Sequence, residues 1–239
     1  MNWALLRQFP WLDTRARFVA GTPRAGALLD LGSSDGETLG HIAELRPDVR
    51  LFAADQAGQP EKYPAGCQFQ RVNLDQEKLP WPDRSMDAIT CMHLIEHLKD
   101  LSLVVREAFR LLKPEGRIYF ETPHPKSLML SSPRGAAAGT FTLNFFDDPT
   151  HVRPVSIGAL ARQVRNAGLA VVASGTSRNW LFAAAYPLFM FLPASPVRYP
   201  WRGGKYLWRG LSHRASRKKF TARVHWLGWS AYLIASRPA

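Results

Sequence analysis

The stretch that decides the fold is Leu28–Leu39, with the sequence LLDLGSSDGETL. It begins as an apolar strand, turns at Gly32 and Gly36, and continues with residues typical of a helix. Glycine lets the backbone approach a ligand closely because no Cβ intervenes. The loop matches neither GxGxxG nor a phosphate-binding P-loop, since no Lys-Ser/Thr pair follows it. It predicts a ligand-binding turn at the carboxyl end of a first strand.

Apolar runs and amphipathic stretches alternate along the chain around this turn. The order of strands and crossover helices predicts an α/β fold, a doubly wound and mostly parallel sheet with both faces covered. The expected helices are Glu37–Leu45, Leu101–Leu112 and Ser156–Ala167. The expected strands are Ala27–Leu31, Val49–Ala54, Cys67–Val72, Asp87–Met92, Arg117–Thr122, Leu169–Ala173 and His225–Ala235.

Length and composition favour one domain that fills residues 1–239. The chain has 46% hydrophobic and 21% charged residues. A chain of this length can bury a full core without disulfide bonds or structural metals. Within it we expect an N-terminal helical segment, a cofactor-binding core, an insertion before the final strand, and the last strand itself. Their expected ranges are 1–24, 25–177, 178–223 and 224–239.

The expected compartment is the cytoplasm. Cys67 and Cys91 are too few for a disulfide framework, and Cys91 lies in an apolar run, so a reducing environment is favoured. The N-terminal residues lack the pattern of a signal peptide. The longest apolar stretch, Trp180–Ala194, is broken by two prolines and is shorter than the roughly 20 residues that a spanning helix needs.

Two acidic residues close the first two expected strands. Asp30 supplies a carboxylate beside the glycine turn, and Asp55 follows 25 residues later. A carboxylate at the end of the second strand can accept hydrogen bonds from both hydroxyls of a ribose. The alternative is that Gly32, Gly36 and Asp55 only form turns.

The chain resembles the class I S-adenosylmethionine-dependent methyltransferases over about residues 25–175. The resemblance rests on ordered blocks: LLDLGSSDG, FAAD, RVNLDQEKLPWPDRSMDAI, and CMHLIEHLKDL followed by REAFRLLKPEGRIYFETP. A further block, DDPTHVRPVSIGALARQVRNAGL, is similar to one in members that act on saccharides and natural products. The resemblance implies a seven-stranded Rossmann-like sheet with a reversed last strand. It also implies S-adenosyl-L-methionine as cofactor and S-adenosyl-L-homocysteine as product.

The resemblance also implies roles for residues at the strand ends. Those of the glycine turn would surround the methionine part of the cofactor, Asp55 would hold the ribose, and Met92 and His93 would line the sulfonium. The turn departs from the usual pattern at Ser33, Ser34 and Asp35, and Pro-His replaces the common Pro-Asn after the fifth strand. The expected cofactor-binding residues are Asp30, Gly32, Ser33, Gly36, Asp55, Gln56, Asn73, Leu74, Met92 and His93.

Three histidines are candidates for the base that removes an acceptor proton. His93 ends the fourth strand, His124 follows the fifth, and His151 lies in the loop before the next helix. Histidine suits the task because its ordinary pKa lies near neutrality. The His151 loop could close over the site. The alternative for each is an ordinary surface or turn histidine.

The sequence His93-Leu-Ile-Glu96-His97 has the H-x-x-E-H letters of a metal site. An inverted zinc-hydrolase site requires this pentapeptide on a helix, and here it begins at a strand end. Some small-RNA 2′-O-methyltransferases and quinone-precursor O-methyltransferases carry E-x-x-E-H at this place and bind a divalent metal. Because His93 replaces the first Glu, we expect no metal, with Glu96 and His97 bracing the start of the helix.

The C-terminal part of the chain is strongly basic. Residues 149–239 hold 14 Lys/Arg and no Asp or Glu, and residues 178–223 interleave ten of these cations with three Trp, three Tyr and four Phe. Three interpretations stay open: a substrate-covering lid, a lid that also meets an anionic membrane or lipid-linked substrate, and a nucleic-acid surface.

The sequence therefore predicts a methyltransferase, with O-methylation of a saccharide, a lipid-linked glycan or a natural-product hydroxyl as the expected reaction. The expected partners are a small-molecule or lipid-linked acceptor and, weakly, an anionic membrane surface, which would make the protein peripheral. One alternative is an RNA methyltransferase that uses the basic region for phosphate. Another is a non-catalytic regulatory module that binds the cofactor. The oligomeric state is left open.

Overall fold

The computed structural model describes residues 6–129, 144–190, 224–225 and 227–239. Its centre is a sheet of seven strands in the order β3-β2-β1-β4-β5-β7-β6. β7 runs antiparallel to both of its neighbours, while the pairs from β3 to β5 are parallel. The predicted fold, with its reversed last strand, is confirmed. The strands are β1 Ala27–Leu31, β2 Arg50–Asp55, β3 Gln68–Arg71, β4 Met86–Met92, β5 Leu112–Pro123, β6 Ala170–Ser177 and β7 Ser230–Ser236.

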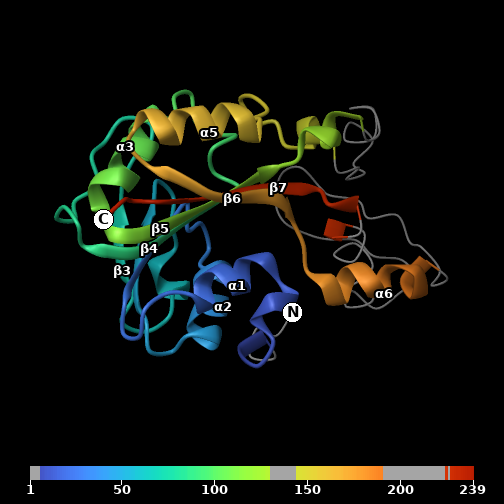
Figure 1. The fold of residues 1–239 in the computed structure, drawn as a ribbon, viewed down its shortest axis with the longest axis horizontal. Coiled ribbons are helices and arrows are strands. Elements are labelled where there is room, and N and C mark those ends of the chain that lie inside the picture. Colours follow the sequence, from blue (N-terminus) through green and yellow to red (C-terminus); the bar gives the residue numbers. More distant parts are fainter. Residues whose placement is uncertain (1–5, 130–143, 191–223, 226) are drawn as a thin grey trace.

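Helices cover the sheet on both faces (Figure 1). α3 and α5 lie on one face and α1 and α2 on the other. Each pair closes its own apolar cluster against the sheet, and the central strands contribute side chains to both clusters. The α-helices are α1 Thr14–Ala20, α2 Glu37–Leu45, α3 Ser102–Leu111, α5 Ile157–Asn166 and α6 Trp180–Met190. Short 3-10 turns are η2 Pro10–Leu12, η3 Pro60–Lys62, η4 Pro125–Met129 and η5 Phe145–Asp147.

Local sequence explains where these helices start and which side they bury. Asp13 caps α1 by accepting hydrogen bonds from two backbone amides, and Ser156 caps α5 by accepting one. α3 keeps apolar residues at helical spacing, and Val104, Ala108 and Leu111 are fully buried. This packing holds the carboxyl ends of the parallel strands at one edge of the sheet.

Three strand boundaries differ by more than one residue from the sequence-based expectation. The last strand begins at Ser230 rather than His225, because the chain turns at Gly228 with a φ of 61°. β6 extends to Ser177 despite its polar letters, since it is an edge strand that pairs with β7 along this length. β5 begins directly after α3, at Leu112, which pairs with Met86.

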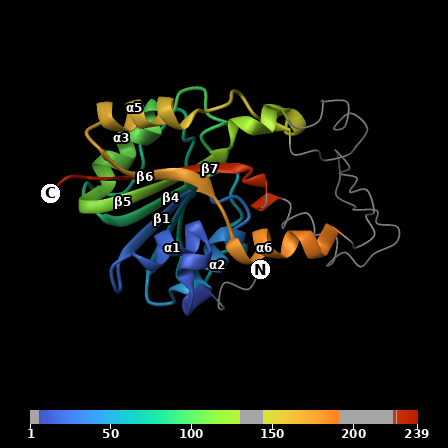
Figure 2. The ribbon, with the colours of Figure 1, turned by 45° about the vertical axis from the view of Figure 1, so that its right-hand side comes forward.

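α6 begins three residues after β6 and projects beyond the carboxyl end of the sheet (Figures 1 and 2). It lies in the part expected to be an insertion between the last two strands, and residues 191–223 of that part lie outside the described residues. Among the helices in the described ranges, α6 included, none combines the length and the apolar character that a bilayer crossing requires. Cys67 and Cys91 are both free thiols.

Candidate functional site

The two glycines of the turn after β1 leave its backbone without side chains, as the sequence predicted. Gly32 and Gly36 adopt φ values of 77° and 79°, where a side chain is strained. A Cβ at Gly36 would also collide with the ring of Tyr63. The Tyr63 hydroxyl lies 2.9 Å from the Ser33 hydroxyl and donates to the Ser34 carbonyl at 3.0 Å. The turn is therefore fixed by the segment that follows β2.

Asp55 ends β2 beside this turn. Its carboxylate accepts hydrogen bonds from the backbone amides of Ser34, at 2.8 Å, and Ala57, at 2.6 Å. Each carboxylate oxygen has a second lone pair, so the group retains acceptor capacity for a ligand hydroxyl. The neighbouring Gln56 is exposed, and its carbonyl accepts a hydrogen bond from Arg71. The glycine turn and the acid predicted from the sequence thus lie side by side.

Asp30 is a buried acid of the site, only 2% exposed. It accepts a 2.7 Å hydrogen bond from the Thr90 hydroxyl of β4. Burial raises the pKa of Asp30 to about 7; the Thr90 hydrogen bond opposes the shift, and the charge of Asp55 adds to it. A cation bound nearby would favour the ionised form.

The remaining expected cofactor residues lie at adjacent strand ends. Asn73 and Leu74 follow β3, where the amide of Val72 donates to the carbonyl of Asp55. Leu74 is 6% exposed, and the Asn73 side chain accepts a hydrogen bond from the amide of Asp75. Met92 closes β4 and is half-buried. The structure therefore gathers the residues predicted for a cofactor along the carboxyl edge of β1 to β4.

His93 sits between two buried carboxylates. Its Nδ1 lies 3.2 Å from Glu96 and its Nε2 lies 3.3 Å from Glu121, which ends the apolar run of β5. Burial lowers the pKa of His93, but the hydrogen bonds with Glu121 and Glu96 outweigh this and raise it to about 10. With both nitrogens donating to carboxylates, the ring is an imidazolium. In this arrangement it has no lone pair with which to accept a proton.

Further groups hold this arrangement in place. The Tyr119 hydroxyl donates to Glu121 at 2.5 Å, and the Trp229 ring stacks on His93 with centroids 5.4 Å apart. Burial opposes ionisation of Glu121, yet the charges of Arg15 and His93 keep its pKa well below the usual range. The result is a fixed positive ring between fixed negative groups.

His97 and His151 lie on the other side of Glu96. One potential ligand atom from each of these three residues lies within 4.8 Å of the others. The His151 Nδ1 is 2.6 Å from the carbonyl of Phe145, which can only accept, so Nδ1 donates; Nε2 lies 4.0 Å from the Asp148 carboxylate and carries the lone pair in the neutral ring. The His97 Nδ1 lies 3.0 Å from the Thr150 hydroxyl, which itself donates to Asp148, and 3.3 Å from the Thr150 carbonyl, so this nitrogen donates as well. Both rings therefore present Nε2 as a proton acceptor or a metal ligand.

His124 lies near the same edge but in a different role. Its backbone amide donates to the carbonyl of Trp229, and its Nδ1 accepts a hydrogen bond from the amide of Lys126. Burial and the charge of Lys126 both lower the pKa of His124. The ring therefore caps the turn that begins η4.

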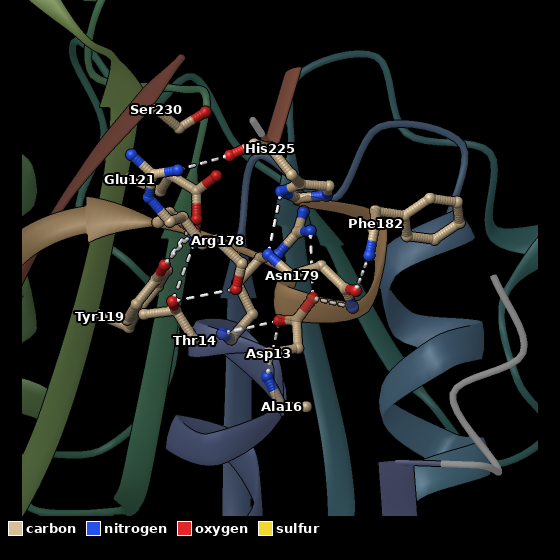
Figure 3. A network of polar contacts seen from close by, with 12 residues as sticks. Asp13, Thr14, Ala16, Tyr119, Glu121, Arg178, Asn179, Phe182, His225 and Ser230 are labelled. Carbon is tan, nitrogen blue, oxygen red and sulfur yellow. Dashed lines mark hydrogen bonds and ion pairs between the residues drawn. The ribbon is translucent and has the colours of Figure 1, made fainter. Parts of the chain in front are cut away.

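A buried polar network links the site to the ends of the expected insertion (Figure 3). Asp13 accepts a 3.0 Å hydrogen bond from the Asn179 side chain, and the Asn179 amide donates to His225 Nδ1 at 3.0 Å. Arg15 lies beside Asp13, and its charge also acts on Glu121. The N-terminal segment thus reaches Asn179 and, through it, His225, and its Arg15 acts on the carboxylate that holds His93.

Sequence reasoning missed several residues of this site. It named His93, Glu96, His97 and His151, but not Glu121, Trp229 or Ser230, which lies 3.4 Å from His93. Glu121 had a readable signal, a carboxylate in the otherwise apolar end of a buried strand, where a partner is required. The other two come from the far end of the chain, and no local pattern connects them to His93.

Comparison with known proteins agrees with this geometry. The family model described as a methyltransferase domain matches residues 4–174. A ubiquinone biosynthesis O-methyltransferase of Pseudomonas putida is 28% identical over 67% of this chain and 69% of its own length. A ubiquinone/menaquinone biosynthesis C-methyltransferase of Desulfotalea psychrophila is 32% identical over 42% of this chain, but the match spans only 44% of that protein.

The solved structures show the same architecture. A SAM-dependent methyltransferase from Archaeoglobus fulgidus superposes with a TM-score of 0.59 at 18% identity, over 98% of this chain and 92% of that one. Identity this low is evidence for the fold alone, whereas the family model covers well over half of the chain. The chain belongs to the methyltransferase-domain family and is a class I S-adenosylmethionine-dependent methyltransferase.

Proposed function

We propose that this protein methylates a hydroxyl oxygen of a small aromatic acceptor. The observation that carries the proposal is His151, an imidazole held through Nδ1 by the Phe145 carbonyl and grouped with Glu96, the carboxylate that also pairs with the charged His93. The relatives named as ubiquinone biosynthesis O-methyltransferases support an aromatic hydroxyl over the saccharide or glycan expected from the sequence.

The residues along β1 to β4 would hold the cofactor. Gly32 and Gly36 leave room for the methionine part, and the spare lone pairs of Asp55 suit ribose hydroxyls. Asn73 and Leu74, at the next strand end, would contact the adenine. S-adenosylmethionine supplies the methyl group as an electrophile on its sulfonium.

His151 would then accept the proton of the acceptor hydroxyl at Nε2. The carbonyl of Phe145 keeps the ring in the required tautomer, as an orienting group does in other imidazole bases. The His93 imidazolium, fixed between Glu96 and Glu121, would favour negative charge developing on the acceptor oxygen. The Trp229 ring, which stacks on His93, would lie beside a flat acceptor.

The cluster of Glu96, His97 and His151 also has the donor types of a divalent-metal site. Its carboxylate, however, is already paired with the His93 imidazolium and accepts from the Thr122 hydroxyl at 3.1 Å. A cation placed there would share one carboxylate with an existing positive charge. We therefore retain the expectation that the reaction needs no metal.

The test is methyl transfer to defined acceptors. The full chain is incubated with S-adenosylmethionine labelled in its methyl group and, separately, with a catechol, a monosaccharide and an RNA oligonucleotide. We expect label on the catechol, attached to oxygen as judged by nuclear magnetic resonance of the product. Label on carbon would instead support the activity named for the C-methyltransferase relative, and label on RNA would overturn the proposal.

A further inference from the structure

The solvent-facing side of α6 is apolar. Trp180 is 54% exposed, Leu181 50% and Leu188 74%, and Ala184 and Pro187 are exposed as well. These positions follow the spacing i, i+1, i+4, i+7 and i+8, so they form one helix face. A surface helix normally turns polar residues to water. Among the described residues of α6, this face has no polar side chain.

The N-terminal segment extends this surface. Phe9 is 48% exposed and Trp11 is 62% exposed, and their rings meet edge to face with centroids 6.3 Å apart. Reciprocal hydrogen bonds between Thr14 and Arg178 fix the segment against the start of α6. Trp11 and Trp180 line one groove of about 350 Å³. We call the set Phe9, Trp11, Trp180, Leu181 and Leu188 the interfacial patch.

Cations border the interfacial patch. Arg17 and Arg117 line the groove that Trp11 and Trp180 share, and the described residues lining it include no acidic side chain. The Arg178 guanidinium lies 5.6 Å from the centroid of the Trp180 ring. Tryptophan beside arginine is the combination found at the headgroup level of membranes.

Charge decides between the candidate occupants of this surface. The chain has a net charge of +12, and its last 91 residues hold 14 Lys/Arg and no Asp or Glu. A second copy would place cation against cation, whereas an anionic surface would neutralise them. A lipid bilayer supplies both the negative headgroups and the apolar layer that five exposed apolar side chains require.

We propose that the interfacial patch docks this protein on anionic lipid bilayers, with α6 lying along the membrane surface. α6 follows β6 at the edge of the sheet where β4 and β5 also end, so docking would turn this edge toward the lipid (Figure 2). This attachment is independent of which hydroxyl is methylated. An apolar acceptor dissolved in the bilayer would then have a short path to the site.

The experiment is co-sedimentation of the full chain with vesicles of phosphatidylcholine alone or mixed with phosphatidylglycerol. We expect binding to the mixed vesicles that weakens with added salt, because headgroup attraction is screened within a Debye length. The variant Leu181→Gln/Leu188→Gln keeps every cation and should reduce the partition coefficient at least about tenfold, since apolar contact supplies the rest. Its thermal unfolding should match wild type because both side chains are exposed.

A matched variant, Met129→Gln/Val152→Gln, replaces two exposed apolar side chains outside the interfacial patch and should bind as wild type does. Absence of binding to mixed vesicles would overturn the proposal. So would unchanged binding of Leu181→Gln/Leu188→Gln, which would mean that charge alone attracts the protein. Self-association that this variant abolishes, without vesicle binding, would assign the patch to a second copy.

Discussion

Asp13 and Asn179 stand 166 positions apart in the chain, yet the Asn179 side-chain nitrogen donates a 3.0 Å hydrogen bond to the Asp13 carboxylate in the protein interior (Figure 3). Asp13 also accepts from the amides of Arg15 and Ala16 at the start of α1. One fully buried carboxylate therefore caps a helix and holds the start of α6 at the same time.

Replacing Asp13 with alanine should destabilise the protein by about 2–4 kcal/mol. The loss combines a helix cap, worth about 1 kcal/mol, with buried donors left without an acceptor, about 1–3 kcal/mol. Urea unfolding followed by circular dichroism measures it. Asp13→Asn, which keeps the capping oxygen, should lose less; equal losses in the two variants would mean that the cap is not the important contact.

Asp55→Ala should weaken S-adenosylmethionine binding by about 1.5–3 kcal/mol, because it removes a charge-assisted acceptor from the ribose hydroxyls. Calorimetric titration of the full chain measures this change. Asp83→Ala serves as control, since Asp83 is an exposed partner of Arg110 on another part of the molecule. Cofactor affinity that is unaffected by Asp55→Ala would remove Asp55 from the binding site.

His151→Ala should lower kcat by about 10²–10⁴, the usual contribution of a general base, while cofactor affinity stays near wild type. The readout is turnover with a saturating acceptor, beside a cofactor titration of the same preparation. His41→Ala, on the surface of α2, should leave turnover intact. If His151→Ala retains full turnover, the proton acceptor is another group.

The His93 imidazolium should make stability depend on alkaline pH. The partners raise the pKa of His93 from its ordinary 6.5 to about 10, so its stabilisation is complete below about pH 6.5 and is lost as the pH rises through about 10. The melting temperature should fall more steeply between these values for wild type than for His93→Gln. Parallel curves would show that the two carboxylates do not hold the ring in its charged form.

Activity should survive treatment with a chelator. The reason is the pairing of Glu96 with His93, so that a divalent ion would share this carboxylate with an existing positive charge. Turnover is measured before and after dialysis against the chelator, and again after adding Mg²⁺ or Zn²⁺. A loss restored by either ion, together with inactivity of His97→Ala, would show that Glu96, His97 and His151 bind a metal after all.

Patterns with a short range were enough to predict the framework of this protein. The strand Ala27–Leu31 and the helix Glu37–Leu45 have the predicted bounds, because apolar periodicity and the glycine turn are local signals. The end of β6 was missed, since its polar residues become a strand only through pairing with β7. Long-range partners of this kind leave no trace in one stretch of sequence.

In the candidate site, too, local patterns were predictable and long-range contacts were not. The strand-end residues Asp30, Asp55 and His93 were predictable because parallel strands end at one edge. The state of His93 was not, since it depends on Glu121 from β5 and on Trp229, 136 positions away along the chain. His93 was a candidate base in the sequence, but in the folded protein both of its ring nitrogens are hydrogen-bonded to carboxylates.

The antiparallel pair of β6 and β7 ends with Ser177 opposite Ser230, so the chain leaves and re-enters the sheet at neighbouring positions. The entropic cost of closing a loop rises only slowly with the length of the loop. A longer or shorter connection between β6 and β7 would also disturb no hydrogen bond of the sheet. Cofactor recognition, at β1 to β4, is built by other parts of the chain. The segment between β6 and β7 can therefore be exchanged in chimaeras. Such chimaeras would acquire new acceptors or new attachment sites while the cofactor-binding strands β1 to β4 stay unchanged.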